Sequence, residues 1–151
     1  KMRHLKWLCL IFLVLTGCED NLADDRDRYE LKGSIDLRLG SADSNNYHSI
    51  TIDRSKTQTL HRFTGSLWFD IEGDSVAAEG VKIYWGSNTT WDFQGSDVPV
   101  INSASYSNAS GIFNTMFAPT KAMIGDTIEV YAGWYDLDGN DVVKVYGIIC
   151  R

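Results

Sequence analysis

The C-terminal stretch "DTIEVYAGWYDLDGNDVVKVYGII" (126–149) constrains the fold of this chain more than any other segment. Two runs rich in β-branched and aromatic residues flank Asp138 and Gly139, a pair suited to the positive φ angles of a two-residue type I′ turn. If those two residues form the loop, alternate pairs across the strands are all apolar and share one face, which predicts a buried β-hairpin face. The apolar pairs in this register are Trp134 with Val143, Ala132 with Val145, Val130 with Gly147 and Ile128 with Ile149.

The rest of residues 29–151 follows a similar pattern. Short stretches rich in β-branched and aromatic residues alternate with clusters of Gly, Ser, Asn and Asp, and helical periodicity is hard to find. In "YELKGSIDLRL" (29–39), for example, Leu31, Ile35 and Leu37 share one face of a half-buried strand. We therefore predict one all-β domain over this range, long enough to have its own core. Further strands are predicted at 48–53, 59–63, 66–72, 81–86, 98–103 and 111–117.

The segments "GIFNTMFAP" and "GDTIEVYAGWYDLDGN", followed by a closing strand, resemble the final strands of bacterial immunoglobulin-like domains. A Gly-x-Phe strand, a Pro-containing corner and an Asp-x-x-Gly-Asn turn recur in that family. The resemblance covers about 40 of the 151 residues and implies a single antiparallel β-sandwich of two sheets. The matching positions are Gly111, Phe113, Phe117, Pro119, Gly125, Asp126, Asp136, Gly139 and Asn140.

The opening stretch "LKWLCLIFLVLTGCED" contains nine consecutive apolar residues, from Trp7 to Leu15. A helix that crosses a bilayer needs roughly 20 such residues, so this run is too short to span a membrane. Basic residues precede the run and small residues follow it, which is the pattern of a secretory signal peptide. We therefore predict that residues 1–17 are a signal peptide and take no part in the fold.

The four residues Leu15-Thr16-Gly17-Cys18 resemble the lipobox of bacterial lipoproteins. In that family the cysteine is acylated and becomes the first residue of the mature chain, so the resemblance implies a lipid anchor on Cys18. Each buried methylene contributes about 0.8 kcal/mol, and two or more acyl chains hold a protein stably. The implied location is the bacterial cell envelope, with the outer membrane or cell surface favoured over the inner membrane. The alternative is an ordinary cleaved signal peptide with a chance cysteine.

The segment after this cysteine, "EDNLADDRDR", holds five acidic residues and two arginines. That composition is typical of a solvated linker, so residues 18–28 are predicted to be the lipidated cysteine and a linker. Acidic residues at this position also resemble the surface-export signals of lipoproteins in the Bacteroidota. In enterobacteria, by contrast, an acidic residue beside the cysteine favours retention in the inner membrane. Both interpretations stay open.

Charge limits the classes of partner. Without residues 1–17, Lys plus Arg falls from 14 to 11 against 20 Asp plus Glu, so the net charge of the remainder is near −9. An acidic chain has no electrostatic attraction for nucleic acid or anionic lipid. We therefore expect no nucleic-acid partner, and contact with the membrane through the lipid on Cys18.

The cysteines do not form a disulfide framework. Cys9 leaves with the signal peptide and Cys18 is blocked by lipid, so Cys150 has no intramolecular partner. Cys150 ends an apolar run, which favours a buried structural thiol over a reactive or intermolecular one.

The stretch "IYWGSNTTWDF" gathers aromatic residues in a polar setting. Tyrosine and tryptophan combine a large apolar face with a polar edge, and such side chains stack on sugar rings in carbohydrate-binding modules. Trp85 shares a strand face with Ile83, which predicts a place in the core. Trp91, Tyr84 and Phe93 are the candidate ligand-binding residues.

The predicted hairpin supplies two further candidate sites. Its reverse face carries Tyr131, Tyr135 and Tyr146, a candidate surface for docking a partner protein. Its turn, "DLDGND", is rich in oxygen ligands of the kind that calcium prefers. The spacing does not fit an EF-hand, so we favour a surface turn over a metal site, with a weak candidate site at Asp136, Asp138 and Asp141.

Catalytic motifs are absent from the sequence. It contains no Gly-x-Ser-x-Gly elbow, no His-Glu-x-x-His, no phosphate-binding glycine loop and no Cys-x-x-Cys. His48 and His61 are too few for a histidine-rich metal site and are expected at solvated strand edges. We therefore predict a protein that is not an enzyme and needs no cofactor. Two hypotheses remain: a tethered binding or adhesion module for a glycan, surface polymer or protein, and a structural or assembly lipoprotein that docks an envelope protein.

Overall fold

The computed structural model of the chain describes residues 29–151. The predicted signal peptide (1–17) and the predicted lipidated Cys18 with its linker (18–28) lie outside the described residues. Within 29–151, no helix has the length and apolar character needed to cross a bilayer. Apart from one short 3-10 helix, η2 (Lys121–Met123), the regular structure there is all β, as predicted. The strands are β1 (Tyr29–Asp36), β2 (Tyr47–Ile50), β3 (His61–Ile71), β4 (Asp74–Ala77), β5 (Lys82–Ser87), β6 (Thr90–Phe93), β7 (Ser96–Pro99), β8 (Ala104–Tyr106), β9 (Ile112–Phe117), β10 (Thr127–Tyr135) and β11 (Asp141–Cys150).

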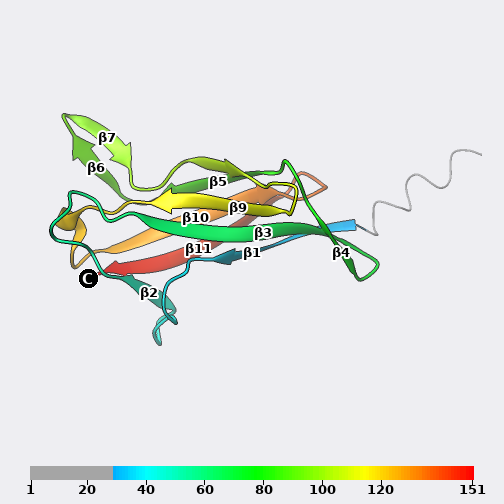
Figure 1. The fold of residues 1–151 in the computed structure, drawn as a ribbon, viewed down its shortest axis with the longest axis horizontal. Coiled ribbons are helices and arrows are strands. Elements are labelled where there is room, and N and C mark those ends of the chain that lie inside the picture. The colour runs from blue at the N-terminus through cyan, green and yellow to red at the C-terminus, as the bar shows by residue number, and fades with distance from the viewer. Residues whose placement is uncertain (1–28) are drawn as a thin grey trace, which may run out of the picture.

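Two sheets lie one over the other in a sandwich-like arrangement (Figure 1). In the four-stranded sheet, β3 is central, with β1 on one side and both β9 and β4 on the other. The five-stranded sheet has the order β2-β11-β10-β5-β8, in which β2 is parallel to β11 and the other pairs are antiparallel. A separate hairpin of β6 and β7 projects from the end of the molecule opposite to Tyr29 (Figure 1).

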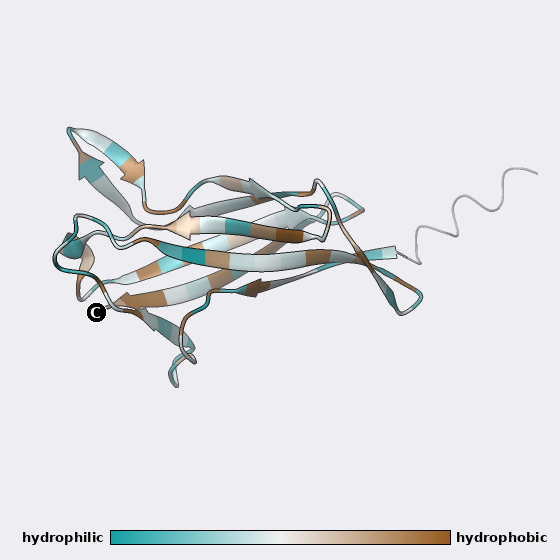
Figure 2. Cartoon of the chain, in the orientation of Figure 1, coloured by the Kyte–Doolittle hydropathy of each residue, from teal (hydrophilic) through white to brown (hydrophobic). Residues whose placement is uncertain are grey.

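The core lies between the two sheets, and apolar and polar residues alternate along strands such as β3 and β9 (Figure 2). Aromatic rings from both sheets meet there: the Trp85 ring centroid is 6.4 Å from that of Phe63 and 6.0 Å from that of Phe113. Trp134 is only 1% exposed, and a Cβ added at Gly33 would lie 2.7 Å from its Cζ2 atom. Gly33 therefore leaves the space that the Trp134 ring fills.

The register of the C-terminal hairpin differs from the prediction by one residue. Trp134 lies opposite Val142, so the predicted pairing with Val143 is wrong. On β10 the buried face is the predicted one, whereas β11 is turned over. Val143 and Val145 are exposed, and Ile148 is buried in the core. The hairpin is present as predicted, but its four predicted cross-strand pairs are wrong.

The cause of this shift is a three-residue loop in place of the predicted two-residue turn. The N–H of Asp136 donates to the carbonyl of Asn140 at 2.9 Å, and the N–H of Gly139 donates to the carbonyl of Asp136 at 3.1 Å. Asp136 Oδ1 also accepts the N–H groups of Asp138 at 3.0 Å and Asn140 at 2.7 Å. Gly139 has the positive φ, 82°, that closes a three-residue loop. The extra residue moves the side chains of β11 to the opposite face.

Two predictions in the first half of the domain also need correction. The predicted strands 59–63 and 66–72 form one strand, β3, which continues through Gly65. A Cβ at Gly65 would lie 2.7 Å from Phe113 Cε2, so this glycine marks a close aromatic contact and not a break. The predicted strand 98–103 is replaced by the end of β7 and an isolated bridge at Ile101, and the short strands β4, β6 and β8 were not predicted.

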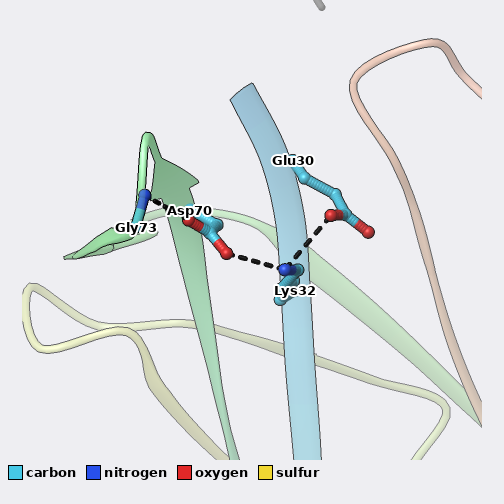
Figure 3. Close-up of polar contacts among 4 residues, drawn as sticks. All are labelled: Glu30, Lys32, Asp70 and Gly73. Carbon is cyan, nitrogen blue, oxygen red and sulfur yellow. Dashed lines mark hydrogen bonds and ion pairs between the residues drawn. The ribbon is translucent and has the colours of Figure 1, made fainter. Parts of the chain in front are cut away.

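The outer face of the four-stranded sheet carries a polar cluster (Figure 3). Lys32 Nζ on β1 donates to Asp70 Oδ2 on β3 at 2.6 Å and lies 3.2 Å from Glu30 Oε2. Asp70 Oδ1 accepts the N–H of Gly73 at 3.1 Å in the turn before β4. The bond from Lys32, and then that from Gly73, lowers the pKa of Asp70. These contacts join β1 to β3 on the solvent side.

We expect Trp134→Ala to lower the free energy of unfolding by about 3–5 kcal/mol, because it removes a fully buried ring and leaves a cavity. Val145→Ala is the matched control on the partner strand. Because Val145 is 59% exposed, this change should cost less than about 1 kcal/mol. Guanidinium denaturation measures both values. A loss at Val145 as large as that at Trp134 would contradict the observed register.

We expect Asp70→Asn to destabilise the fold at neutral pH more than in acid. The pKa of Asp70 is lowered from its ordinary value of 3.8, so its interaction with Lys32 contributes stability above that pH and loses it as the pH falls through the folded-state pKa. The effect should be small because solvent screens the pair. Urea denaturation at about pH 7 and about pH 2 should show the gap between wild type and variant closing in acid. A gap that is equal at both pH values would refute this account.

Candidate functional site

The outer side of the five-stranded sheet is aromatic, in contrast to the polar cluster on the other sheet. Tyr131 on β10 is 41% exposed and Tyr135 is 58% exposed, although both are large and partly apolar. Cross-strand pairing places tyrosines and valines of the neighbouring strands on the same side. Contiguous exposed apolar groups of this kind mark interaction surfaces. We call this surface the tyrosine face; its members are Tyr47, Tyr84, Tyr106, Tyr131, Tyr135, Val143 and Val145.

Three tyrosines of this face lie over glycines of the adjacent strand. Each tyrosine is directly opposite its glycine, and a Cβ added to the glycine would collide with the tyrosine ring. At Gly133, for example, that Cβ would lie 2.5 Å from Tyr84 Cζ. The missing side chains therefore let the rings lie down across the neighbouring backbone. The pairs are Tyr47 over Gly147, Tyr84 over Gly133 and Tyr131 over Gly86.

Tyr84 is held in place by two neighbours. Its hydroxyl donates to the carboxylate of Asp141 at the start of β11, and its ring centroid lies 5.7 Å from that of Tyr135. The hydrogen bond to Asp141, followed by burial, raises the pKa of Tyr84 to about 12. The phenol thus stays protonated at physiological pH, and the ring is oriented before any ligand binds.

Charged groups are sparse on the tyrosine face. Alternation along its five strands brings only Lys82, Glu129 and Asp141 to this side among the described strand residues. Asp141 is already bonded to Tyr84. The surface therefore offers flat apolar area and hydroxyl groups more than charge.

The structure separates the residues that the sequence grouped. Tyr131 and Tyr135 lie together on the tyrosine face, but Tyr146 lies opposite Val130 and packs against the core, because β11 is turned over. Tyr84, predicted beside Trp91, joins the tyrosine face instead. Tyr47 and Tyr106 were not among the candidate residues. Gly147 inside β11 is a sequence signal for Tyr47, since glycine within a strand marks close packing from a neighbour. Tyr106 lies opposite Lys82 and has no such signal.

Trp91 and Phe93 lie on the projecting hairpin, with ring centroids 5.2 Å apart. Trp91 packs against the core, and its Nε1 is buried with no hydrogen-bond partner among the described residues. Its ring lines a groove of about 490 Å³, together with several threonines and with Lys121 and Asp126. Phe93 is exposed. Trp91 therefore has a structural role, as the anchor of this hairpin, in addition to lining the groove.

A second groove, of about 570 Å³, lies beside the start of β1. Tyr29, Phe69 and Ile71 line one part of it, and Leu137 and Asp138 of the C-terminal hairpin loop line the other. This groove is mostly apolar and lies beside Tyr29, the first residue of β1.

Asp136 of the weak candidate metal site and both histidines of residues 29–151 are hydrogen-bonded to backbone groups. Within residues 29–151, no three His, Cys, Asp or Glu side chains are placed to hold a metal ion together. Asp136 of the weak candidate site instead accepts hydrogen bonds within its own loop, and these lower its pKa. Ring nitrogens of His48 and His61 are bonded to the carbonyls of Gly40 and Leu37.

Cys150 is 1% exposed at the end of β11. Burial, with a smaller contribution from Asp126, raises the pKa of its thiol to about 11. Because the thiolate is the reactive form, Cys150 is an inert core residue at neutral pH. This confirms the predicted buried structural thiol.

No protein-family model matches the chain, and no curated protein matches it.

Proposed function

We propose that this chain is a lipid-anchored protein of the bacterial cell envelope and that its sandwich is a non-catalytic binding module. The observation that carries the proposal is the tyrosine face. Six of its members, Tyr47, Tyr106, Tyr131, Tyr135, Val143 and Val145, are exposed large hydrophobic residues on one sheet face. Apolar area gathered in this way costs solubility unless a ligand or partner covers it.

The anchor is supported by the sequence. The lipobox-like Leu15-Thr16-Gly17-Cys18 directly follows the apolar run, and the acidic segment after it would space the domain from the membrane. The chain enters the domain at Tyr29, at the end away from the projecting β6–β7 hairpin (Figure 1).

We also propose that the sandwich is immunoglobulin-like. Its strand order supports this: β1, β3 and β9 share one sheet, and β5, β10 and β11 share the other. That is how strands A, B and E, and strands C, F and G, divide between the sheets of the immunoglobulin fold.

A second candidate function is an assembly lipoprotein that docks a partner protein of the envelope on the same face. Val143 and Val145 favour it, because aliphatic side chains beside tyrosines and few charges are typical of the centre of a protein interface. Both candidate functions require the tyrosine face to be exposed and intact.

The anchor is tested by Cys18→Ser in the full chain. We expect the wild-type protein in the membrane fraction and the variant in the soluble fraction, because one acyl-accepting thiol carries all of the membrane affinity. Cys150→Ser is the matched control and should stay with the membranes, since Cys150 is buried in the core. A Cys18→Ser protein that remains membrane-bound would reject the lipid anchor.

The binding surface is tested by Tyr131→Ala combined with Tyr135→Ala in the full chain. We expect binding to envelopes isolated from the producing bacterium to fall at least about tenfold, because the change removes stacking area from the centre of the face. Tyr29→Ala is the matched control, since Tyr29 is 43% exposed but lies on β1 in the other sheet. Equal binding by the double variant, with an unchanged melting temperature, would reject the tyrosine face as the binding surface.

A further inference from the structure

We infer that the tyrosine face takes a neutral polysaccharide, whose sugar rings stack on the flattened rings of Tyr84, Tyr131 and Tyr47. This inference rests on the proposed function, since it names the ligand of the same surface. The shape of the face, the position of its rings and its charge all favour such a ligand.

The rings are presented flat. Tyr84, Tyr131 and Tyr47 each lie over a glycine, so each ring covers backbone of the neighbouring strand. Tyr47 and Tyr131 are also exposed to solvent. A pyranose ring has a flat face of C–H groups that matches an aromatic ring lying parallel to it. The bond from Tyr84 to Asp141 fixes one of these rings in advance, which lowers the entropic cost of binding.

The three rings are distributed across the sheet. They cover Gly133 on β10, Gly86 on β5 and Gly147 on β11, and neighbouring strands lie about 4.8 Å apart. Counted along β10, the covered glycines lie level with residues 133, 131 and 129, so the stacking positions are spread over three neighbouring strands. An extended polymer of several sugar units can contact all three, whereas a single small molecule covers one.

The tyrosine face lies outside the two grooves described above. Anchor residues of protein interfaces insert into well-packed pockets. The groove beside Tyr29 and the groove beside Trp91 contain no member of the tyrosine face. A broad flat ligand suits this surface better than one that projects a side chain.

Charge favours a neutral ligand. Lys82 is the one cationic side chain on this side of the described strands, and Glu129 and Asp141 are both anionic. The whole chain has a formal net charge of −6. Anionic polysaccharides are repelled by such a surface, whereas neutral ones are bound through stacking and hydroxyl groups.

The test uses the detergent-purified full chain on columns of immobilised neutral polysaccharides (β-glucan, xylan, mannan and starch), with alginate as the anionic comparison. We expect the wild-type chain to be retained on at least one neutral matrix, and retention to persist in about 0.5 M salt because no ion pair carries it. Retention on alginate alone, or on none of the five matrices, would overturn the inference.

Gly86→Ala tests the flat ring itself. The added methyl group occupies the place of the Tyr131 ring, so the ring must lift while its phenol group remains. We expect retention to fall at least about tenfold, a loss typical of one interfacial anchor. Gly40→Ala is the matched control, because an added Cβ there meets nothing within 4 Å. If Gly86→Ala fails to fold, Tyr131→Ala replaces it. Full retention by a folded variant of either kind would overturn the stacking role of Tyr131.

Binding to isolated envelopes separates this inference from the proposed function. Suppose that the wild-type chain binds untreated envelopes, the tyrosine variants do not, and protease treatment of the envelopes abolishes binding. The ligand is then a protein, so the glycan inference fails while the binding module stands. If the tyrosine variants bind envelopes as the wild type does, the proposed function fails as well.

Discussion

The carboxylate of Asp136 sets the geometry on which the two faces of the larger sheet depend. By accepting the N–H groups of Asp138 and Asn140, it closes a loop with an odd number of residues between β10 and β11. Loop length fixes which residues of β11 face the core, because side chains alternate from one face to the other. The same choice that brings Ile148 inward leaves Val145 beside Tyr131 on the outside. The exposed face is thus a direct result of a hydrogen-bonded turn.

The two sheets of the sandwich meet solvent differently. On the four-stranded sheet, Lys32 and Asp70 form an ion pair between β1 and β3. Polar side chains are usual on the solvent-exposed face of an antiparallel sheet. On the five-stranded sheet, tyrosines lie over glycines and leave apolar area exposed. Both faces come from the same alternation of residues, so the difference lies in which side chains occupy the outward positions. Only the second face needs a function to explain it.

The sequence was sufficient for the fold class and for the core face of β10, because alternation around Trp134 is long and unambiguous. It was not sufficient for the register of the hairpin. The sequence "DLDGN" is compatible with a two-residue turn through Asp138 and Gly139 as well as with the observed loop. The hydrogen bonds of Asp136 decide between the two turns, and they cannot be read from the sequence. The residues that replace Val143 and Val145 opposite Trp134 and Ala132 are Val142 and Lys144, so the apolar pattern favoured the predicted register over the observed one.

The sequence predicted only part of the tyrosine face, for a related reason. Tyr131 and Tyr135 are two residues apart on one strand, so simple alternation places them together. Tyr47 is remote in sequence and reaches the face through a parallel pairing between β2 and β11, which no local pattern encodes. Tyr84 and Gly133 also meet through a long-range pairing, the antiparallel one between β5 and β10. Long-range strand pairing, and not residue type, determined which aromatic residues gather.

The division of the N-terminal strands between the two sheets has a mechanical consequence. β1 is bonded to β3 in one sheet, and the next strand, β2, is bonded in parallel to β11 in the other. The segment 37–46, which joins these two strands, therefore passes from one sheet to the other. A force that pulls on residue 29 along β1 loads the β1–β3 ladder in shear, so its hydrogen bonds resist together (Figure 1). If that ladder yields, β2 still holds the chain to the sheet that carries the tyrosine face. If the domain is pulled from this end while a ligand occupies the tyrosine face, the loss of β1 leaves the ligand-bound sheet attached to the chain through β2.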